Sequence, residues 1–225
     1  MEIASKIDHT NLNPLATSAD IKKLCDEARS FHFASVCVNP SFVSFAAQNL
    51  KDSDVKVCTV IGFPLGADTI DNKAASAAVA VDEGASEIDF VQNLAFVKEK
   101  KWDDLEDEIR AVVDSSNSVY TQDERKIVVK VILETCFLSD DEIVKCCQIA
   151  KKAGADFVKT STGFASAANS GATEHAVSLM RKTVGDDFGV KASGGIRTKS
   201  DVLKMLAAGA NRIGTSSGIK IISEK

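Results

Sequence analysis

Two lysine residues interrupt apolar segments of the chain, and a glycine-containing loop follows each of them. Lys159 lies in "ADFVKTSTGF" and Lys191 lies in "GVKASGGIR". Lysine is seldom buried, because taking its unpaired charge out of water costs free energy. It attacks a carbonyl carbon only as the neutral amine, and with an ordinary pKa of about 10.4 it is almost fully protonated at pH 7. Desolvation and a nearby ammonium group both favour the neutral amine, so one lysine of such a pair is expected to prime the other.

Imine formation with an aldehyde or ketone is the reaction that such a lysine pair suits. The protonated imine is an electron sink, so the adjacent carbon–carbon bond can break, which is the chemistry of metal-free aldolases. The chain has only three histidines, whereas metal-dependent aldolases normally need histidine ligands. Its six cysteines include no C-x-x-C pair and predict reduced thiols that mostly fill the core, with Cys37 and Cys136 as minor candidates for lining a pocket. We therefore expect no metal ion and no other cofactor.

Three further ionisable residues, Asp8, Asp89 and Lys130, lie within or near the ends of apolar segments. Taken singly, each is more often structural, as a snorkelling lysine or a carboxylate that caps a turn. In a closed barrel, however, the inward-facing residues of different strands point to one place. Because mutually paired charges can also be structural, this cluster alone leaves a structural and a catalytic role equally open.

Short apolar segments rich in valine and isoleucine alternate with longer amphipathic ones along the chain. The expected strands cover residues 4–9, 35–38, 56–61, 87–91, 128–133, 157–160, 190–192 and 211–214. Little polar alternation within them is typical of strands covered on both faces. The intervening segments begin with serine or threonine caps, as in "TSADIKKLCDEARSFH", "SDDEIVKCCQIAKKAG" and "TKSDVLKMLAAG".

One junction between a helix and the following strand occurs three times, in "DEGASEIDF", "KKAGADFVK" and "LAAGANRIG". In each copy a glycine closes the helix in the left-handed conformation. A repeated unit of this kind, with eight strands in 225 residues, predicts a (β/α)8 TIM barrel. A doubly wound open sheet is the alternative fold. No linker rich in proline, glycine or serine divides the chain, so we expect a single domain over residues 1–225.

The loops after the last expected strands have the composition of a phosphate site. Glycine lets backbone N–H groups approach an anion closely, and barrels of this type often bind phosphate with these loops and a short helix. Plain turns are the alternative explanation. The candidate phosphate-binding residues are Gly163, Gly194, Gly195, Gly214, Ser216 and Ser217, with Arg197 as a possible forked donor.

The overall composition excludes several classes of partner. A formal charge of −5 gives none of the basic surface of a nucleic-acid-binding protein. The longest apolar runs are far shorter than the 18 or so residues of a membrane span. "MEIASKIDHT" lacks the apolar core of a secretory signal, so we expect a cytoplasmic protein that contacts neither nucleic acid nor membrane.

These motifs together resemble the deoxyribose-phosphate aldolase family over most of the chain. The matching segments are "KIDHTNL", "VCVNP", "VIGFPLG", "EIDFV", "KVILET", "FVKTSTGF", "VKASGGIRT" and "RIGTSSG". The resemblance implies a (β/α)8 barrel and reversible cleavage of 2-deoxy-D-ribose 5-phosphate to D-glyceraldehyde 3-phosphate and acetaldehyde, in deoxyribonucleotide catabolism. It also implies a monomer or a homodimer.

The resemblance assigns a role to each candidate residue. Lys159 is the Schiff-base lysine, Lys191 perturbs it, and Asp89 transfers protons through water. Lys130 and Asp8 support this polar network, and the glycine and serine residues named above bind the phosphate.

The chain departs from some family members at two points. Phe164 follows "TSTG" where some members have a lysine, and the only tyrosine, Tyr120, lies in the middle of the chain and not in a C-terminal tail. Two other interpretations stay open: another barrel lyase or isomerase, and a protein that binds a phosphosugar without transforming it.

Overall fold

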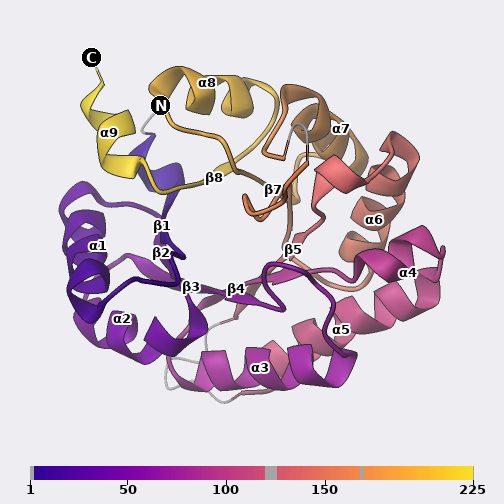
Figure 1. Ribbon diagram of the computed structural model, residues 1–225, viewed down its shortest axis with the longest axis horizontal. Coiled ribbons are helices and arrows are strands. Elements are labelled where there is room, and N and C mark those ends of the chain that lie inside the picture. Colours follow the sequence, from indigo (N-terminus) through magenta and orange to yellow (C-terminus); the bar gives the residue numbers. More distant parts are fainter. Residues whose placement is uncertain (1–2, 120–125, 168–169, 225) are drawn as a thin grey trace.

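Eight parallel strands form a closed barrel at the centre of the molecule (Figure 1). The structure is a computed structural model that describes residues 3–119, 126–167 and 170–224. Each strand pairs with the next in sequence order, and β1 pairs with β8 to close the barrel. The strands are β1 (Ile7–Asn11), β2 (Ser35–Val38), β3 (Lys56–Ile61), β4 (Glu87–Val91), β5 (Val128–Ile132), β6 (Phe157–Lys159), β7 (Gly189–Ser193) and β8 (Arg212–Thr215). The closure confirms the predicted TIM barrel and excludes the open sheet.

Helices surround this barrel as an outer ring (Figure 1). The α-helices are α1 (Ser18–Phe31), α2 (Val43–Asn49), α3 (Ile70–Asp82), α4 (Leu94–Lys98), α5 (Trp102–Ser118), α6 (Asp140–Lys152), α7 (Glu174–Val184), α8 (Lys199–Ala207) and α9 (Gly218–Ser223). Short 3-10 helices are η1 (Ala4–Lys6), η2 (Pro40–Phe42) and η3 (Thr135–Phe137). None of the helices in the described part of the chain is both long and apolar enough to cross a membrane.

The three repeated junctions have the same backbone geometry. Gly84, Gly154 and Gly209 all have positive φ angles, of 113°, 92° and 109°. The alanine after each glycine donates its N–H to the carbonyl five residues earlier, at 2.9, 3.1 and 2.9 Å. This is the Schellman pattern, in which the left-handed glycine satisfies the last carbonyls of the helix. The prediction of a repeated helix-to-strand turn is therefore confirmed.

The first strand begins later than the sequence pattern predicts. Residues 4–6 form η1, and Lys6 donates its N–H to Ile3 O at 3.0 Å, so the extended segment starts only at Ile7. Asp8 is therefore the second residue of β1, whereas the sequence pattern predicts a position near the end of the strand. The other strands agree with the predicted ranges to within two residues. Tyr120, noted above, lies outside the described residues.

Alternate residues of each strand face the barrel interior or the helices. In β5 this alternation places the fully buried Val129 and Val131 in the main apolar core, while Lys130 contacts side chains from neighbouring strands inside the barrel. The apolar layer between strands and helices therefore stabilises the fold, and the interior of the barrel is left for polar side chains.

Candidate active site

Asp89 of β4 is the centre of the polar interior, and three lysines surround its carboxylate. Lys130 donates to Asp89 Oδ1 at 2.7 Å. Lys159 and Lys191 both donate to Asp89 Oδ2, at 2.8 and 2.7 Å. Lys159 and Lys191 are paired across β6 and β7, so these strands place the two amino groups against the same oxygen atom. The structure thus brings together the two lysines that the sequence singled out.

A second group of ion pairs extends from this centre. Lys191 also pairs with Asp8, and Arg212 Nε donates to Asp8 Oδ1 at 2.6 Å. Arg212 further pairs with Glu87, which lies 2.7 Å from Lys130 Nζ. We call the seven connected residues the barrel cluster: Asp8, Glu87, Asp89, Lys130, Lys159, Lys191 and Arg212.

The barrel cluster holds four basic side chains against three carboxylates among the residues that the structure describes. One basic group is therefore in excess. If one lysine loses its proton, the cluster becomes neutral and no carboxylate is left without a cation. A buried site with this composition tolerates a neutral amine, whereas an equal number of opposite charges would not.

Burial and pairing set the charge of the other members. Burial alone would raise the pKa of Asp89, but the surrounding ammonium groups outweigh it and hold that pKa well below its ordinary range. Burial lowers the pKa of Lys191, but the carboxylates of Asp8 and Asp89 outweigh this effect and hold it above its usual value. The pKa of Lys130 is raised in the same way, chiefly by Asp89 against the effect of burial. Lys130 and Lys191 are thus held as ammonium groups.

A cavity of about 750 Å³ opens above the barrel cluster, lined by the ends of β1, β6, β7 and β8 and the loops that follow them. Lys159 is the one member of the cluster that lines it. The Lys159 side chain is 5% exposed, against 1% for Lys191 and 0% for Lys130. Lys159 is therefore the member of the barrel cluster that a molecule in the cavity can reach.

The predicted phosphate loops lie on the wall of this cavity. Five of the six candidate residues line it: Gly163, Gly194, Gly195, Gly214 and Ser216. Ser217 does not line it, although its backbone N–H donates to Thr215 Oγ1 in the same loop at 2.9 Å. Arg197 does line it.

The structure shows why two of these positions are occupied by glycine. Gly194 has a φ of 85° and packs against Gly171, whose Cβ would lie 2.4 Å from the Gly194 carbonyl oxygen. A Cβ on Gly214 would lie 3.2 Å from Lys191 Cε and 3.0 Å from Ser193 Cβ. Gly214 thus leaves room for the second lysine, a role that the sequence analysis did not foresee.

Glu134 follows β5 and holds the loop that carries Gly163. It is 2% exposed and has a left-handed backbone with φ 55°. Its carboxylate accepts from the Thr162 backbone N–H at 3.2 Å and also from the Thr162 hydroxyl. The same hydroxyl accepts from Phe164 N at 3.0 Å. Glu134 therefore fixes the loop directly after Lys159, and no lysine pairs with it within the described residues.

The sequence analysis missed Glu87 and Arg212, although a signal for both was present. Each is the first residue of its strand, where a charge is easily taken for part of a surface turn. Glu87 stands two residues before Asp89, and Arg212 two residues before Gly214, so period-two counting places both on the inward face.

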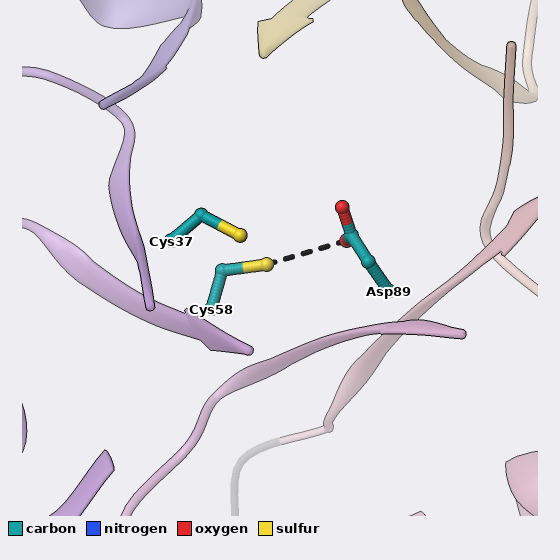
Figure 2. Close-up of side chains that lie close together, drawn as sticks. All are labelled: Cys37, Cys58 and Asp89. Atoms are coloured by element: carbon teal, nitrogen blue, oxygen red, sulfur yellow. Dashed lines mark hydrogen bonds between the residues drawn. The ribbon is translucent and has the colours of Figure 1, made fainter. Parts of the chain in front are cut away.

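All six cysteines are free, and all but Cys136 are buried. Within the part of the chain that the structure describes, two groups of side chains have spacing that suits a metal ion: Cys37, Cys58 and Asp89 (Figure 2), and Asp8, Cys58 and Glu87. In the second group both carboxylates are already paired with Arg212. The first group contains two thiols and is considered further below.

Comparison with known proteins identifies the family to which this chain belongs. A model of the DeoC/LacD family aldolases matches residues 3–224. The chain is 57% identical over 224 residues to the deoxyribose-phosphate aldolase of Caldanaerobacter subterraneus subsp. tengcongensis, covering 100% of this chain and 94% of that protein. It is 53% identical over 222 residues to the deoxyribose-phosphate aldolase of Bacillus subtilis, covering 99% and 95%.

Among solved structures, the deoxyribose phosphate aldolase from Aeropyrum pernix, described as tetrameric, superposes with a TM-score of 0.88 at 34% identity. The match covers 98% of this chain and 89% of that one. These matches confirm the resemblance that the motifs indicate. The chain belongs to the DeoC/LacD family of aldolases.

Proposed function

We propose that this protein cleaves 2-deoxy-D-ribose 5-phosphate reversibly to D-glyceraldehyde 3-phosphate and acetaldehyde through an imine on Lys159. The observation that carries the proposal is the shared contact of Lys159 and Lys191 with one oxygen of Asp89. The high identity to deoxyribose-phosphate aldolases supports the choice of substrate.

Lys159 is the nucleophile because it alone combines a place in the barrel cluster with a place on the cavity floor. The carboxylates around Lys130 and Lys191 keep those side chains charged, and an ammonium group cannot attack a carbonyl carbon. The excess basic group of the cluster is therefore the one at Lys159. Lys191 acts as a fixed cation that disfavours a second charge beside it.

The reaction begins when the neutral amine of Lys159 adds to C1 of the open-chain sugar phosphate. Loss of water from the resulting carbinolamine gives the protonated imine. A base then removes the proton of the C3 hydroxyl, the C2–C3 bond breaks, and its electron pair passes into the imine to form an enamine. Glyceraldehyde 3-phosphate leaves, the enamine is protonated at C2, and hydrolysis of the new imine releases acetaldehyde and the free lysine.

Asp89 is proposed to transfer these protons through water. Since the surrounding ammonium groups hold it as a carboxylate, it accepts a hydrogen bond from a water molecule and so orients that water towards the substrate. A water between Asp89 and the substrate can take the C3 hydroxyl proton and return it to C2. Lys130 and Asp8 hold Asp89 and Lys191 in place for this role.

The phosphate group of the substrate is proposed to bind at the wall of the cavity formed by the loops after β6, β7 and β8. Backbone N–H groups near Gly163, Gly194 and Gly195 and the side chain of Ser216 are available there. Gly214 and Ser217 complete the set. Phe164 lines the same cavity with its ring 5.2 Å from that of Phe63, in place of the lysine that some relatives have.

Borohydride trapping tests the imine directly. Incubation with acetaldehyde and sodium borohydride should add one ethyl group to Lys159, located by peptide mass spectrometry. Lys159→Met should take up no label, whereas Lys191→Met should still be labelled, more slowly. Labelling on Lys191 in the unaltered protein would refute the assignment of roles.

Release of acetaldehyde from deoxyribose phosphate distinguishes this function from the two competing ones. The assay is run with and without a metal chelator, and equal rates are expected. Another lyase or isomerase would consume the substrate without acetaldehyde, and a binding protein would return it unchanged after long incubation.

We further propose that the whole chain is one catalytic domain that works in the cytoplasm as a monomer or a homodimer. Six free cysteines fit a reducing compartment. The structural relative described as tetrameric makes the assembly worth measuring by light scattering after size-exclusion chromatography.

A further inference from the structure

Two cysteine thiols lie beside the central carboxylate inside the barrel. The register of β2 and β3 pairs Cys37 with Cys58, and the two are 1% and 0% exposed. Their sulfur atoms and a carboxylate oxygen of Asp89 all lie within 4.8 Å of one another (Figure 2). Cys58 donates its S–H to Asp89 Oδ1 at 3.3 Å. The mechanism proposed above uses neither thiol.

This spacing fits the coordination shell of a thiophilic metal ion. A tetrahedral zinc site has Zn–S bonds of about 2.3 Å and Zn–O bonds of about 2.0–2.2 Å, which place its ligand atoms roughly 3.5–3.8 Å apart. The three ligand atoms therefore need small movements, and Lys130 must give way to the ion, because its Nζ lies 2.7 Å from Asp89 Oδ1 and 3.5 Å from Cys58 Sγ. Thiolates select ions such as Zn²⁺ and Cd²⁺ over Mg²⁺ and Ca²⁺.

The nearby lysines do not prevent binding, because the exchange conserves charge. A divalent ion brings two positive charges, and the two thiols lose one proton each as they become thiolates. The net charge of the barrel interior is then the same before and after the ion enters. The alternative group at Asp8 and Glu87 has a single thiol, so metal binding there would leave added positive charge beside Arg212.

We propose that Cys37, Cys58 and Asp89 form a binding site for a thiophilic divalent metal ion, and that its occupation inhibits the aldolase. The ion takes Asp89 Oδ1, which now accepts from Lys130 at 2.7 Å, and withdraws negative charge from the oxygen shared by Lys159 and Lys191. The inhibition rests on the role proposed for Asp89, whereas the site itself does not.

Cadmium chloride titration of the purified, chelator-treated protein tests both parts. Binding is followed by sulfur-to-cadmium charge-transfer absorption in the ultraviolet, and activity by acetaldehyde release. We expect one ion per chain, an absorption that reports two thiolates, loss of most activity, and recovery when a chelator is added. The absorption does not depend on turnover, so a failure of the proposed aldolase function is distinguishable from a failure of the metal site.

Three variants make the test specific. Cys37→Ala and Cys58→Ala should each weaken cadmium binding and inhibition by roughly tenfold or more, with activity compared to the metal-free rate of the same variant. Cys136→Ala removes the most accessible thiol and should behave as the unaltered protein. Cys37→Ser is the substitute if the alanine variant does not fold, since a serine hydroxyl is a poor ligand for cadmium.

Two results would overturn the metal site: cadmium absorption that persists in both Cys37→Ala and Cys58→Ala, and binding that is lost only in Cys136→Ala. Binding at the pair that leaves the aldolase rate unchanged would overturn the inhibition alone.

Discussion

Buried lysines occur in two regions of this molecule, and they are paired in different ways. Between α3 and α5, Lys73 Nζ donates to Glu108 Oε1 at 2.6 Å and to the carbonyl oxygens of Gly66 and Val91 at 2.8 and 2.9 Å. Inside the barrel, three lysines share the single carboxylate of Asp89. An ammonium group has three donors, so Lys73 is fully satisfied and belongs to one carboxylate.

The difference teaches that burial of a lysine does not by itself indicate catalysis. Lys73 is 0% exposed and does not line the cavity above the barrel cluster, and it ties the loop after β3 to the end of β4. Lys159 has a shared partner, a cluster with one excess basic group, and access to the cavity. The pairing of Lys73 with Glu108 stabilises a buried ammonium group, whereas the barrel cluster can lose one proton and still leave every carboxylate paired.

Replacing each lysine by methionine is the strongest way to break this comparison. Lys159→Met should fold and lose at least about 10⁴-fold in kcat, since removal of a covalent nucleophile leaves only binding and electrostatic effects. Lys73→Met should lose stability, while the folded fraction keeps a kcat within a few fold of the unaltered protein. Acetaldehyde release and urea unfolding of the two variants provide the measurements. If Lys73→Met lost kcat as severely while remaining folded, the two sites would not differ as described.

The Lys73–Glu108 pair should show a large effect on stability and a small one when both partners are changed. Despite the pairing, burial lowers the pKa of Lys73 and raises the pKa of Glu108, so desolvation outweighs the attraction. Lys73→Met alone leaves a buried carboxylate unpaired and should cost roughly 3–5 kcal/mol of unfolding free energy. Lys73→Met with Glu108→Leu should cost clearly less, because no charge remains. Urea unfolding of both variants measures this, and equal losses would contradict it.

Much of the fold could be predicted from the sequence because the signals are local. The glycine-alanine junctions at Gly84, Gly154 and Gly209 and the capping residues Thr17 and Ser139 determine where helices begin and end, and both features are present in the structure. The start of β1 could not be predicted, because residues 4–6 have no pattern that distinguishes a 3-10 turn from a strand.

The candidate site could be predicted in part, for a related reason. Lys159, Lys191 and Asp89 stand inside apolar segments, where a charge is conspicuous. Glu87 and Arg212 stand at strand starts, where charges are common, and the excess of positive charge could not be counted without them. The contact of Cys37 with Cys58 depends on the register between β2 and β3, which sequence patterns do not specify.

Lys191→Met tests whether a fixed cation is what distinguishes the barrel site. Since its pKa is raised, Lys191 is charged throughout the working pH range, and its removal takes away the repulsion that disfavours an ammonium group at Lys159. Loss of this fixed cation should lower kcat at pH 7 by about 10²-fold, equivalent to ~2.7 kcal/mol in the activation free energy. The rate should recover as pH rises, so the acid limb of the pH–rate profile moves to higher pH. A uniform loss at every pH would instead give Lys191 a positioning role only.

Glu134→Gln tests where the barrel cluster ends, because the hydrogen bonds to the buried Glu134 carboxyl come from Thr162, and the charge of Lys159 only partly offsets its burial. Burial raises its pKa, so the folded protein keeps this proton to higher pH than the unfolded chain does. Between the two pKa values the folded state binds more protons, and the free energy of unfolding falls as pH rises through that window. Glu134→Gln lacks this titration and should therefore gain stability relative to the unaltered protein as pH rises above the ordinary pKa of a glutamate carboxyl. Its glutamine oxygen still accepts from Thr162, so kcat should fall by less than about tenfold. Urea unfolding across this pH range decides the matter: a relative loss of stability by the variant would mean that Glu134 is stabilised as a carboxylate, and it would then belong with Asp8 and Asp89.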